Sequence, residues 1–322
     1  MLEDKDLRSL QEVRQKVQTA YEAFLRYRSF TQEQVDRIVD AAAEAARRNS
    51  VALAELAVEE TGYGNVRDKI AKNLLNSDTL HRYMRPLKTA GVIRESAEEG
   101  LVEIAEPKGV VAAILPTTNQ TSTAFYKIMI ALKSRNAIVL SPHPRARRST
   151  CEAARLLSEA AVAAGAPDGV VQCVNEATIE GTNELMRHRR TAIVLSTGGS
   201  GIVRAAYSSG KPALGVGPGN VPVLIDSTAN LEDSIRQVVD GKSFDFGTVC
   251  SSEQTIVVEQ RHREETWRAL REHGAYVCDQ AQTAALQKLL ITADFHINPD
   301  CVGQSPQKIA RMAGFEIPEA ER

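Results

Sequence analysis

The run GVVAAILPTTN, residues 109–119, decides the fold class of this chain. Its first seven residues are apolar or glycine with no polar alternation, which is typical of a strand covered on both faces of a sheet. Pro116 to Asn119 then make a polar turn, and a helical pattern runs from about Ser122 to Ser134. A buried strand that turns directly into a helix predicts the start of a parallel α/β sheet.

The same strand-then-helix rhythm recurs three more times along the chain. The expected strands are Gly109 to Leu115, Asn136 to Leu140, Val170 to Val174 and Thr191 to Leu195, and their helices are Ser122 to Ser134, Arg147 to Ala164, Ile179 to Arg187 and Ser200 to Ser208. This alternation predicts an α/β fold with a Rossmann-type parallel sheet between helices. Ligands of such sheets bind beyond the carboxyl ends of the strands, so we expect the functional residues there.

Helices are expected before this sheet and a second α/β alternation after it. Apolar residues recur at helical spacing over residues 7–83, with Thr31 as an N-cap, and two short strands at 92–105 predict a hairpin. The run 211–222 holds three glycines and three prolines, so we expect an ordered loop. We predict a first domain over residues 1–226 and a second α/β domain over 227–322.

Composition excludes several classes of function. Of 322 residues, 39 are basic and 41 acidic, with a net charge of −2 and no basic stripe, which disfavours a nucleic-acid partner. Aromatic residues make up only 5% of the chain, which also disfavours a protein that binds single-stranded nucleic acid by stacking bases on aromatic side chains. No apolar run has the length of a membrane span, and Met1 to Arg8 lacks the apolar block of a signal peptide.

The five cysteines are widely spread and show no paired C-x-x-C spacing. This pattern argues against a zinc site or a disulfide framework and for a reducing compartment, so we expect a cytoplasmic protein. The six histidines show no ligand pair at helical spacing, and no metal is expected. Cys250 differs from the others because it lies between a glycine-containing approach, Phe244 to Gly247, and a short polar run. A thiol placed there can act as a nucleophile, although a half-buried cysteine is the ordinary alternative.

Small residues follow the fourth strand of the predicted sheet. Ser196-Thr197-Gly198-Gly199-Ser200-Gly201 leads directly into a helix, so backbone N–H groups and the helix dipole can face a phosphate or a nicotinamide. The fingerprint G-x-G-x-x-G is absent, and glycines that serve packing alone explain this turn equally well.

Several ordered motifs together resemble the CoA-acylating aldehyde dehydrogenases, which include the aldehyde half of bifunctional aldehyde–alcohol dehydrogenases. The resemblance extends over nearly the whole chain in order and with compatible spacing. The motifs are PTTN at 116–119, SPHPRA at 141–146, TGG at 197–199, AAYSSGKP at 205–212, GVGPGN at 215–220 and the stretch around Cys250. The resemblance implies oxidation of a small aldehyde to an acyl-CoA with NAD or NADP, and coenzyme A as co-substrate.

The resemblance also implies catalytic roles. Cys250 matches the nucleophile, whose thiolate attacks the aldehyde carbonyl to give a thiohemiacetal and, after hydride transfer, a thioester. Asn119 matches the side chain that donates its amide N–H to the developing oxyanion, with a helix N-cap as the structural alternative.

Two departures from hydrolytic relatives point to coenzyme A as the acyl acceptor. Gly215 stands where those relatives carry a glutamate that activates water, and Ser141 stands where they usually carry a lysine that contacts the cofactor ribose. Without the carboxylate, water lacks its general base and a thiolate is the better acceptor. The alternatives left open are oxidation to the free acid and a non-catalytic binding subunit.

The cofactor residues are likewise implied by matching motifs, and Arg145 could meet a 2′-phosphate. The expected cofactor contacts are Thr117, Thr118, Ser141, His143, Arg145, Thr197, Gly198, Gly199, Gly215, Val216 and Gly217. For His143 and Arg145 a solvated turn is the alternative. Relatives continue beyond the equivalent of Arg322, so the second domain is expected to be incomplete. The hairpin at 92–105 corresponds to the oligomerisation arm of relatives, which implies a homodimer or homotetramer.

Overall fold

The computed structural model describes residues 4–322 of the chain. The sequence prediction for Met1 to Arg8 therefore lies partly outside the described residues. Contacts divide the chain into two compact units. The first unit comprises residues 4–61 and 69–218, and the second comprises residues 62–68 and 219–322. The division at 226/227 remains a prediction about functional domains. Each unit is described by itself.

The first unit contains a five-stranded parallel sheet with strand order β5-β4-β3-β6-β7. This confirms the α/β class and the Rossmann-type sheet. The strands are β3 (Val110–Ile114), β4 (Ala137–Ser141), β5 (Val171–Cys173), β6 (Thr191–Thr197) and β7 (Ala213–Val216). The strand order reverses between β3 and β6, and the crevice at such a switch point is where doubly wound sheets bind ligands.

Strand β7 corrects one expectation from the sequence. Residues 213–216 were expected in a loop, but they pair with β6 as the edge strand of the sheet. Glycine and proline weaken the strand pattern, yet an edge strand tolerates both because only one of its sides needs hydrogen-bond partners.

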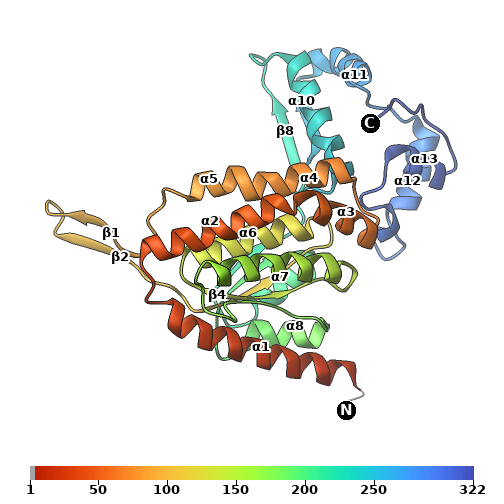
Figure 1. Cartoon of the computed structure of the whole chain (residues 1–322). Helices are drawn as coiled ribbons and strands as arrows, with labels where there is room; N and C mark the ends of the chain where they lie inside the picture. The colour runs from red at the N-terminus through yellow and green to blue at the C-terminus, as the bar shows by residue number, and fades with distance from the viewer. Residues whose placement is uncertain (1–3) are drawn as a thin grey trace. The chain divides into compact units, whose positions relative to one another are not determined.

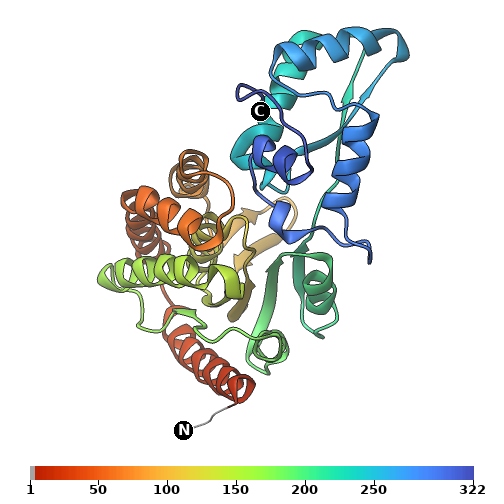
Figure 2. The same ribbon diagram turned by 90° about the vertical axis from the view of Figure 1, so that its right-hand side faces the viewer.

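Helices cover both faces of this sheet (Figures 1 and 2). On one face α2, α6 and α7 pack together, and on the other α1 and α8 pack against each other and the strands, while α9 packs on β6 and β7. Their bounds are α1 (Lys5–Tyr27), α2 (Gln32–Arg48), α6 (Gln120–Lys133), α7 (Arg147–Ala163), α8 (Ile179–Arg187) and α9 (Ser200–Tyr207). Thr31 forms a capping box with Gln34 at the start of α2, which confirms the predicted N-cap.

Three further helical segments precede the sheet. They are α3 (Ser50–Thr61), α4 (Val66–Leu74) and α5 (His81–Met84), with a π-helical turn at Leu75–Leu80 between the last two. The hairpin follows as β1 (Gly91–Ser96) and β2 (Leu101–Ala105), and Figure 1 shows it projecting from the rest of its unit. Its apolar side chains are largely exposed, with Val92 at 51% and Ile104 at 58%.

The second unit has a smaller parallel pair of strands, β8 (Val221–Ile225) and β9 (Glu253–Val258). Its apolar cluster joins Ile225 and Ile235 to Val239 and Ala269, whereas Leu224 on the strand pair is 74% exposed. The helices are α10 (Leu231–Ser243), α11 (Arg263–Glu272), α12 (Gln280–Leu290) and α13 (Pro306–Met312). No helix within residues 4–322 is long and apolar enough to cross a membrane.

A buried lysine ties the two strands that flank the switch point. Lys127 of α6 is fully covered, and its Nζ donates to the carbonyl of Ile114 at 2.6 Å and to that of Leu195 at 2.9 Å. These carbonyls belong to the ends of β3 and β6, so one lysine amino group links both strand ends. Burial lowers the pKa of Lys127 to about 7.

We expect the Lys127→Met variant to change the pH dependence of stability. The folded-state pKa of about 7 lies below the ordinary value of 10.5, so between these pH values the unfolded chain binds more protons. In that window Lys127 makes the free energy of unfolding rise with pH, by at most about 1.4 kcal/mol per unit. Urea unfolding at several pH values should show this rise for the native protein and a flatter curve for the variant. Parallel curves would contradict the assignment.

Candidate active site

Register aligns the carboxyl ends of four strands in the first unit. Ile114 of β3 pairs with Ser141 of β4 and with Ser196 of β6, and Ser196 pairs in turn with Gly215 of β7. The predicted cofactor residues therefore gather along one sheet edge. Those at or next to this row are Thr117, Thr118, Ser141, Thr197, Gly198, Gly199, Gly215, Val216 and Gly217. Asn119 follows β3 at the same edge.

Asn119 precedes α6, but its side chain does not cap that helix. Its Oδ1 instead accepts a hydrogen bond from the ammonium group of Lys72, which is only 8% exposed. An ammonium group can only donate, so the amide atom that faces it must be the oxygen. The Nδ2 group is thereby oriented as the donor end of the amide. Lys69 adds a second buried ammonium, whose Nζ lies 3.1 Å from the carbonyl oxygen of Thr118.

The turn after β6 suits a bound phosphate. Gly199 is the N-cap of α9 without a side-chain hydrogen bond, and a Cβ at Gly199 or Gly201 would meet open space. Backbone N–H groups of this turn can thus be approached closely by an anion. Ser196 Oγ is buried and has no hydrogen-bond partner among residues 4–322. These features fit a dinucleotide cofactor.

Ser141, His143 and Arg145 lie along one segment after β4 and differ in exposure. Ser141 is buried, and its Oγ lies 2.9 Å from Thr182 Oγ1. His143 and Arg145 are exposed in a short 3₁₀ turn, where His143 Nδ1 accepts from the Arg145 N–H at 3.1 Å. Partial desolvation of the ring by neighbouring atoms, and then the Arg145 guanidinium, lower the pKa of His143. This hydrogen bond within the turn needs a neutral imidazole as acceptor. The position of His143 is therefore explained by the solvated turn that was the alternative to a cofactor contact.

Gly215 packs closely beneath α9. A Cβ built there would lie 2.7 Å from Val203 Cγ1 and 2.8 Å from Tyr207 Cε2, and the Gly215 N–H donates to Tyr207 Oη at 3.1 Å. A larger side chain at this position would displace Tyr207. The chain therefore accommodates no carboxylate here without repacking.

Cys250 lies in the second unit, in a turn between a 3₁₀ segment and β9, and its side chain is exposed. The 3₁₀ segment, Phe244–Gly247, contains three consecutive residues with positive φ: Asp245 at 49°, Phe246 at 52° and Gly247 at 68°. Left-handed backbone costs roughly 1–2 kcal/mol for each residue with a Cβ, so the turn needs support from its surroundings.

The buried carboxylate of Asp245 supplies that support. Its Oδ1 accepts from the Asn65 N–H at 2.8 Å and its Oδ2 accepts from Thr248 Oγ1 at 2.6 Å. The Asp245 N–H in turn donates to the Asp68 carboxylate at 2.7 Å. Residues 62–68 thus fix the turn that carries Cys250.

Two glycines allow this arrangement. A Cβ at Gly64 would lie 1.9 Å from Asp245 Oδ1, and a Cβ at Gly303 would lie 2.8 Å from Thr248 Cγ2. The Gly64 N–H also donates to the Gly303 carbonyl at 2.8 Å. Gly62 is the contrasting case, because its φ of +67° resembles that of Gly64 at +72° but nothing lies within 4 Å of its Cβ position.

The sequence interpretation missed Lys72, Asp245, Gly64 and Lys127. The break in the helical pattern at residues 61–64 was visible in the sequence. The contact of the adjoining Asn65 with Asp245, 180 positions later, was not, because no local pattern encodes such a contact. Lys127 could have been suspected from its place on an apolar helix face, but Lys72 could not, because the buried residues of α4 are all polar or charged. Within residues 4–322 no group of three or more histidine, cysteine or acidic side chains is arranged for a metal ion.

Comparison with known proteins identifies the family. A sequence model of the aldehyde dehydrogenase family matches residues 6–278, and this chain belongs to that family. It is 45% identical over 293 residues to the bifunctional aldehyde-alcohol dehydrogenase AdhE of Escherichia coli K12, covering 91% of this chain and 33% of that protein. The chain thus spans about a third of that relative's length.

Solved structures point to the acylating branch. An acetylating aldehyde dehydrogenase from Geobacillus thermoglucosidasius is 46% identical with a TM-score of 0.96, over 99% of this chain and 71% of that one. A propionaldehyde dehydrogenase from Rhodopseudomonas palustris, solved with bound CoA and an acylated cysteine, is 32% identical with a TM-score of 0.87, over 96% and 71% of the two chains. The resemblance to acylating aldehyde dehydrogenases is confirmed by these similarities.

We expect Gly64→Ala to disturb the Cys250 turn and Gly62→Ala to leave it intact. Both substitutions introduce a Cβ at positive φ, but only the first forces a displacement of Asp245. Overpacking of this kind typically costs about 1–3 kcal/mol beyond the backbone strain shared by both. Chemical unfolding and the rate at which Cys250 reacts with a thiol reagent would be compared in the two variants. Equal stability and equal thiol reactivity would show that Asp245 does not control the turn.

Proposed function

We propose that this protein oxidises a small aldehyde to an acyl-CoA, with Cys250 as the nucleophile and NAD or NADP as hydride acceptor. One observation carries the proposal: Gly215, packed against Val203 and Tyr207, leaves no carboxylate at the position where hydrolytic relatives activate water. An exposed thiol can then hold an acyl group that solvent removes only slowly.

The thiolate of Cys250 adds to the aldehyde carbonyl and forms a thiohemiacetal. The Asn119 Nδ2 group donates to the oxygen on which negative charge develops, and Lys72 keeps that end of the amide directed as a donor. A nicotinamide dinucleotide, when bound, supplies the hydride acceptor that converts the thiohemiacetal to a thioester. The thiolate of coenzyme A then attacks the thioester carbonyl, releases acyl-CoA and regenerates Cys250.

The sheet edge of the first unit is the proposed cofactor site. The phosphates would be held by backbone N–H groups at the start of α9, where Gly199 is the N-cap, with Thr197 and Gly198 beside them. The Gly198 N–H itself donates to the Val216 carbonyl at 3.1 Å, so Gly198 would line the site without donating this N–H. At the same edge Thr117 follows β3, and Ser141 and Val216 are the last residues of β4 and β7. The remaining assigned contacts are Thr118, His143, Arg145, Gly215 and Gly217.

Two alternatives to the proposal remain. In the first the thioester is hydrolysed, and in the second no thioester forms. Hydrolysis to the free acid would need a base for water, and the packing of Gly215 disfavours one at that position. A non-catalytic binding subunit would bind the dinucleotide without forming acyl-CoA. The exposed Cys250 and the oriented Asn119 favour the enzyme.

The hairpin supports self-association. Val92, Leu101, Val102 and Ile104 are exposed apolar residues on a two-stranded arm, and such a surface favours burial in an oligomer. We therefore propose a homodimer or homotetramer. A cytoplasmic location agrees with the free thiols, which persist in a reducing compartment.

The test is formation of reduced nicotinamide from short aldehydes with and without coenzyme A. We expect sustained turnover only when coenzyme A is present, and none for Cys250→Ser, which lacks the nucleophile. Sustained turnover without coenzyme A would establish the hydrolytic alternative. Dinucleotide binding with no turnover on any aldehyde would favour the binding subunit.

We expect Asn119→Ala to lower kcat by about 100- to 1000-fold, the usual effect of losing an oxyanion donor. Lys72→Met should lower kcat by about 10- to 100-fold, which corresponds to the free energy of one hydrogen bond to a charged group. Because Lys72 acts through Asn119, adding Lys72→Met to Asn119→Ala should have little further effect on kcat. Lys133→Met is the control: it removes a buried ammonium paired with Asp36 at 2.5 Å and should lower stability without changing kcat. Fully additive losses in the double variant would exclude a positioning role for Lys72.

A further inference from the structure

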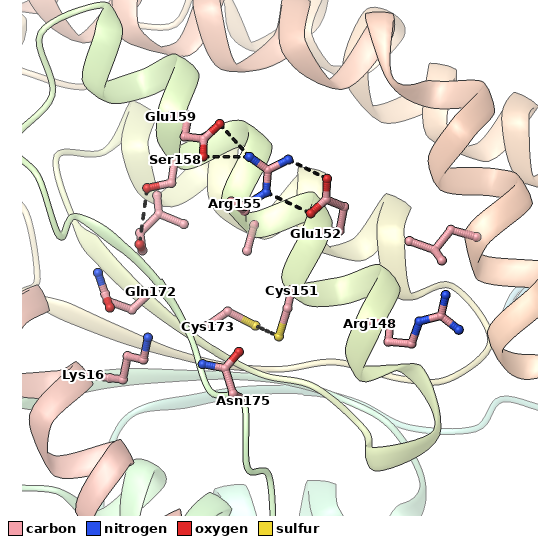
Figure 3. Close-up of a pocket in the computed structure, with 13 residues that line it drawn as sticks. Lys16, Arg148, Cys151, Glu152, Arg155, Ser158, Glu159, Gln172, Cys173 and Asn175 are labelled. Atoms are coloured by element: carbon pink, nitrogen blue, oxygen red, sulfur yellow. Dashed lines mark hydrogen bonds and ion pairs between the residues drawn. The ribbon is translucent and has the colours of Figure 1, made fainter.

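Two thiols outside the candidate active site lie against each other in the first unit. Cys151 is in α7 and Cys173 is the last residue of β5, and their sulfur atoms are 2.9 Å apart (Figure 3). This separation is shorter than the optimal distance of about 3.5–4.0 Å between two carbon atoms, although sulfur is the larger atom. The two sulfur atoms are therefore in close contact. The two residues are 22 positions apart in the chain, and only the packing of α7 on β5 brings them together.

Both thiols line a cavity of about 630 Å³. Lys16, Arg148, Gln172 and Asn175 also line it, and Figure 3 shows the two sulfur atoms facing each other among these polar side chains. A water molecule takes about 30 Å³ of liquid volume, so the cavity has ample room for a small polar oxidant. The pair is therefore accessible to a hydroperoxide.

Their surroundings make the two thiols unequal. A hydrogen bond from Cys173 lowers the pKa of Cys151, and the nearby positive charges of Arg147 and Lys16 act in the same direction, against burial and the Glu12 carboxylate. The Cys151 hydrogen bond and burial raise the pKa of Cys173 well above its ordinary value. Other acidic groups at the cavity are neutralised, because Arg155 pairs with Glu152 at 2.6 Å and with Glu159 at 2.7 Å. Cys151 is thus the more reactive thiol.

We propose that Cys151 and Cys173 are a modification site, at which a hydroperoxide converts the two thiols to a reversible disulfide with Cys151 attacking first and Cys173 resolving. With hydrogen peroxide, the Cys151 thiolate attacks one oxygen, the O–O bond breaks, and a sulfenic acid forms while hydroxide takes up a proton and leaves as water. The Cys173 thiol then attacks the Cys151 sulfur, the S–O bond breaks, and the second water leaves with the Cys173 proton. The two thiols are oxidised by two electrons in total, and the peroxide is reduced by two.

Disulfide formation needs little movement of the chain. The sulfur atoms would approach from 2.9 Å to the covalent distance of about 2.05 Å. The bond would join α7 to β5, two elements already packed together. A reducing thiol reverses the step by exchange, which restores both cysteines.

The experiment uses the Cys250→Ser protein, so that the exposed thiol of the second unit does not compete, and its readout does not depend on activity. The protein is treated with hydrogen peroxide, remaining thiols are alkylated, and peptides are examined by mass spectrometry before and after reduction. We expect one linked pair, Cys151 with Cys173, that forms at least about tenfold faster than oxidation of Cys278 or Cys301. Burial raises the pKa of both Cys278 and Cys301, so they serve as internal controls.

Two further variants separate the roles within the pair. Cys173→Ser should accumulate a sulfenic acid on Cys151 that a cyclic dione traps, and Cys151→Ser should leave Cys173 reduced. The proposal is overturned if no intramolecular Cys151–Cys173 peptide forms, or if all four remaining thiols oxidise at one rate. Should a variant fail to fold, the linked peptide and the relative rates in the Cys250→Ser protein decide the question alone.

Discussion

The turn that carries Cys250 depends on one buried carboxylate. Asp245 accepts hydrogen bonds from the Asn65 backbone and the Thr248 hydroxyl, and it does so while its own backbone and the next two residues are left-handed. A segment with three positive φ values is unfavourable by itself, so the hydrogen bonds to Asp245 keep it in this conformation. Cys250 follows a few residues later, and its side chain is exposed. Gly64 is required for the same reason, since any Cβ there would occupy the space of the carboxylate.

The first unit uses buried lysine side chains in a comparable way. Lys127 joins the ends of β3 and β6 at the switch point, and Lys72 fixes the orientation of the Asn119 amide at the end of β3. An amide has two similar ends, and without a strict donor on one side its orientation is not determined. A cation on the oxygen settles it and leaves the N–H end as the donor. The orientation of the proposed oxyanion donor is therefore set by Lys72, which acts through the Asn119 amide.

The strands of the sheet could be predicted from the sequence, but the side-chain contacts that hold the candidate site in place could not. β3, β4, β5 and β6 carry continuous apolar runs followed by helices, and their bounds were predicted closely because burial on both faces leaves few alternatives. β7 was missed because Gly215 and its flanking prolines resemble a loop, and an edge strand tolerates them. The contacts of Lys72, of Asp245 and between Cys151 and Cys173 join residues 22 or more positions apart, which no local periodicity can reveal. Nucleophile and oxyanion donor were assigned by family resemblance, and their roles stay predictions.

The central claim is that Cys250 holds an acyl group which coenzyme A, and not water, removes. The most direct measurement mixes the protein with aldehyde and dinucleotide without coenzyme A, quantifies reduced nicotinamide per chain, and weighs the Cys250 peptide. The account predicts a burst of about one equivalent, an acylated Cys250 peptide that persists, and its conversion to acyl-CoA when coenzyme A is added. Continued turnover without coenzyme A, with free acid as product and no acylated Cys250 peptide, would contradict it.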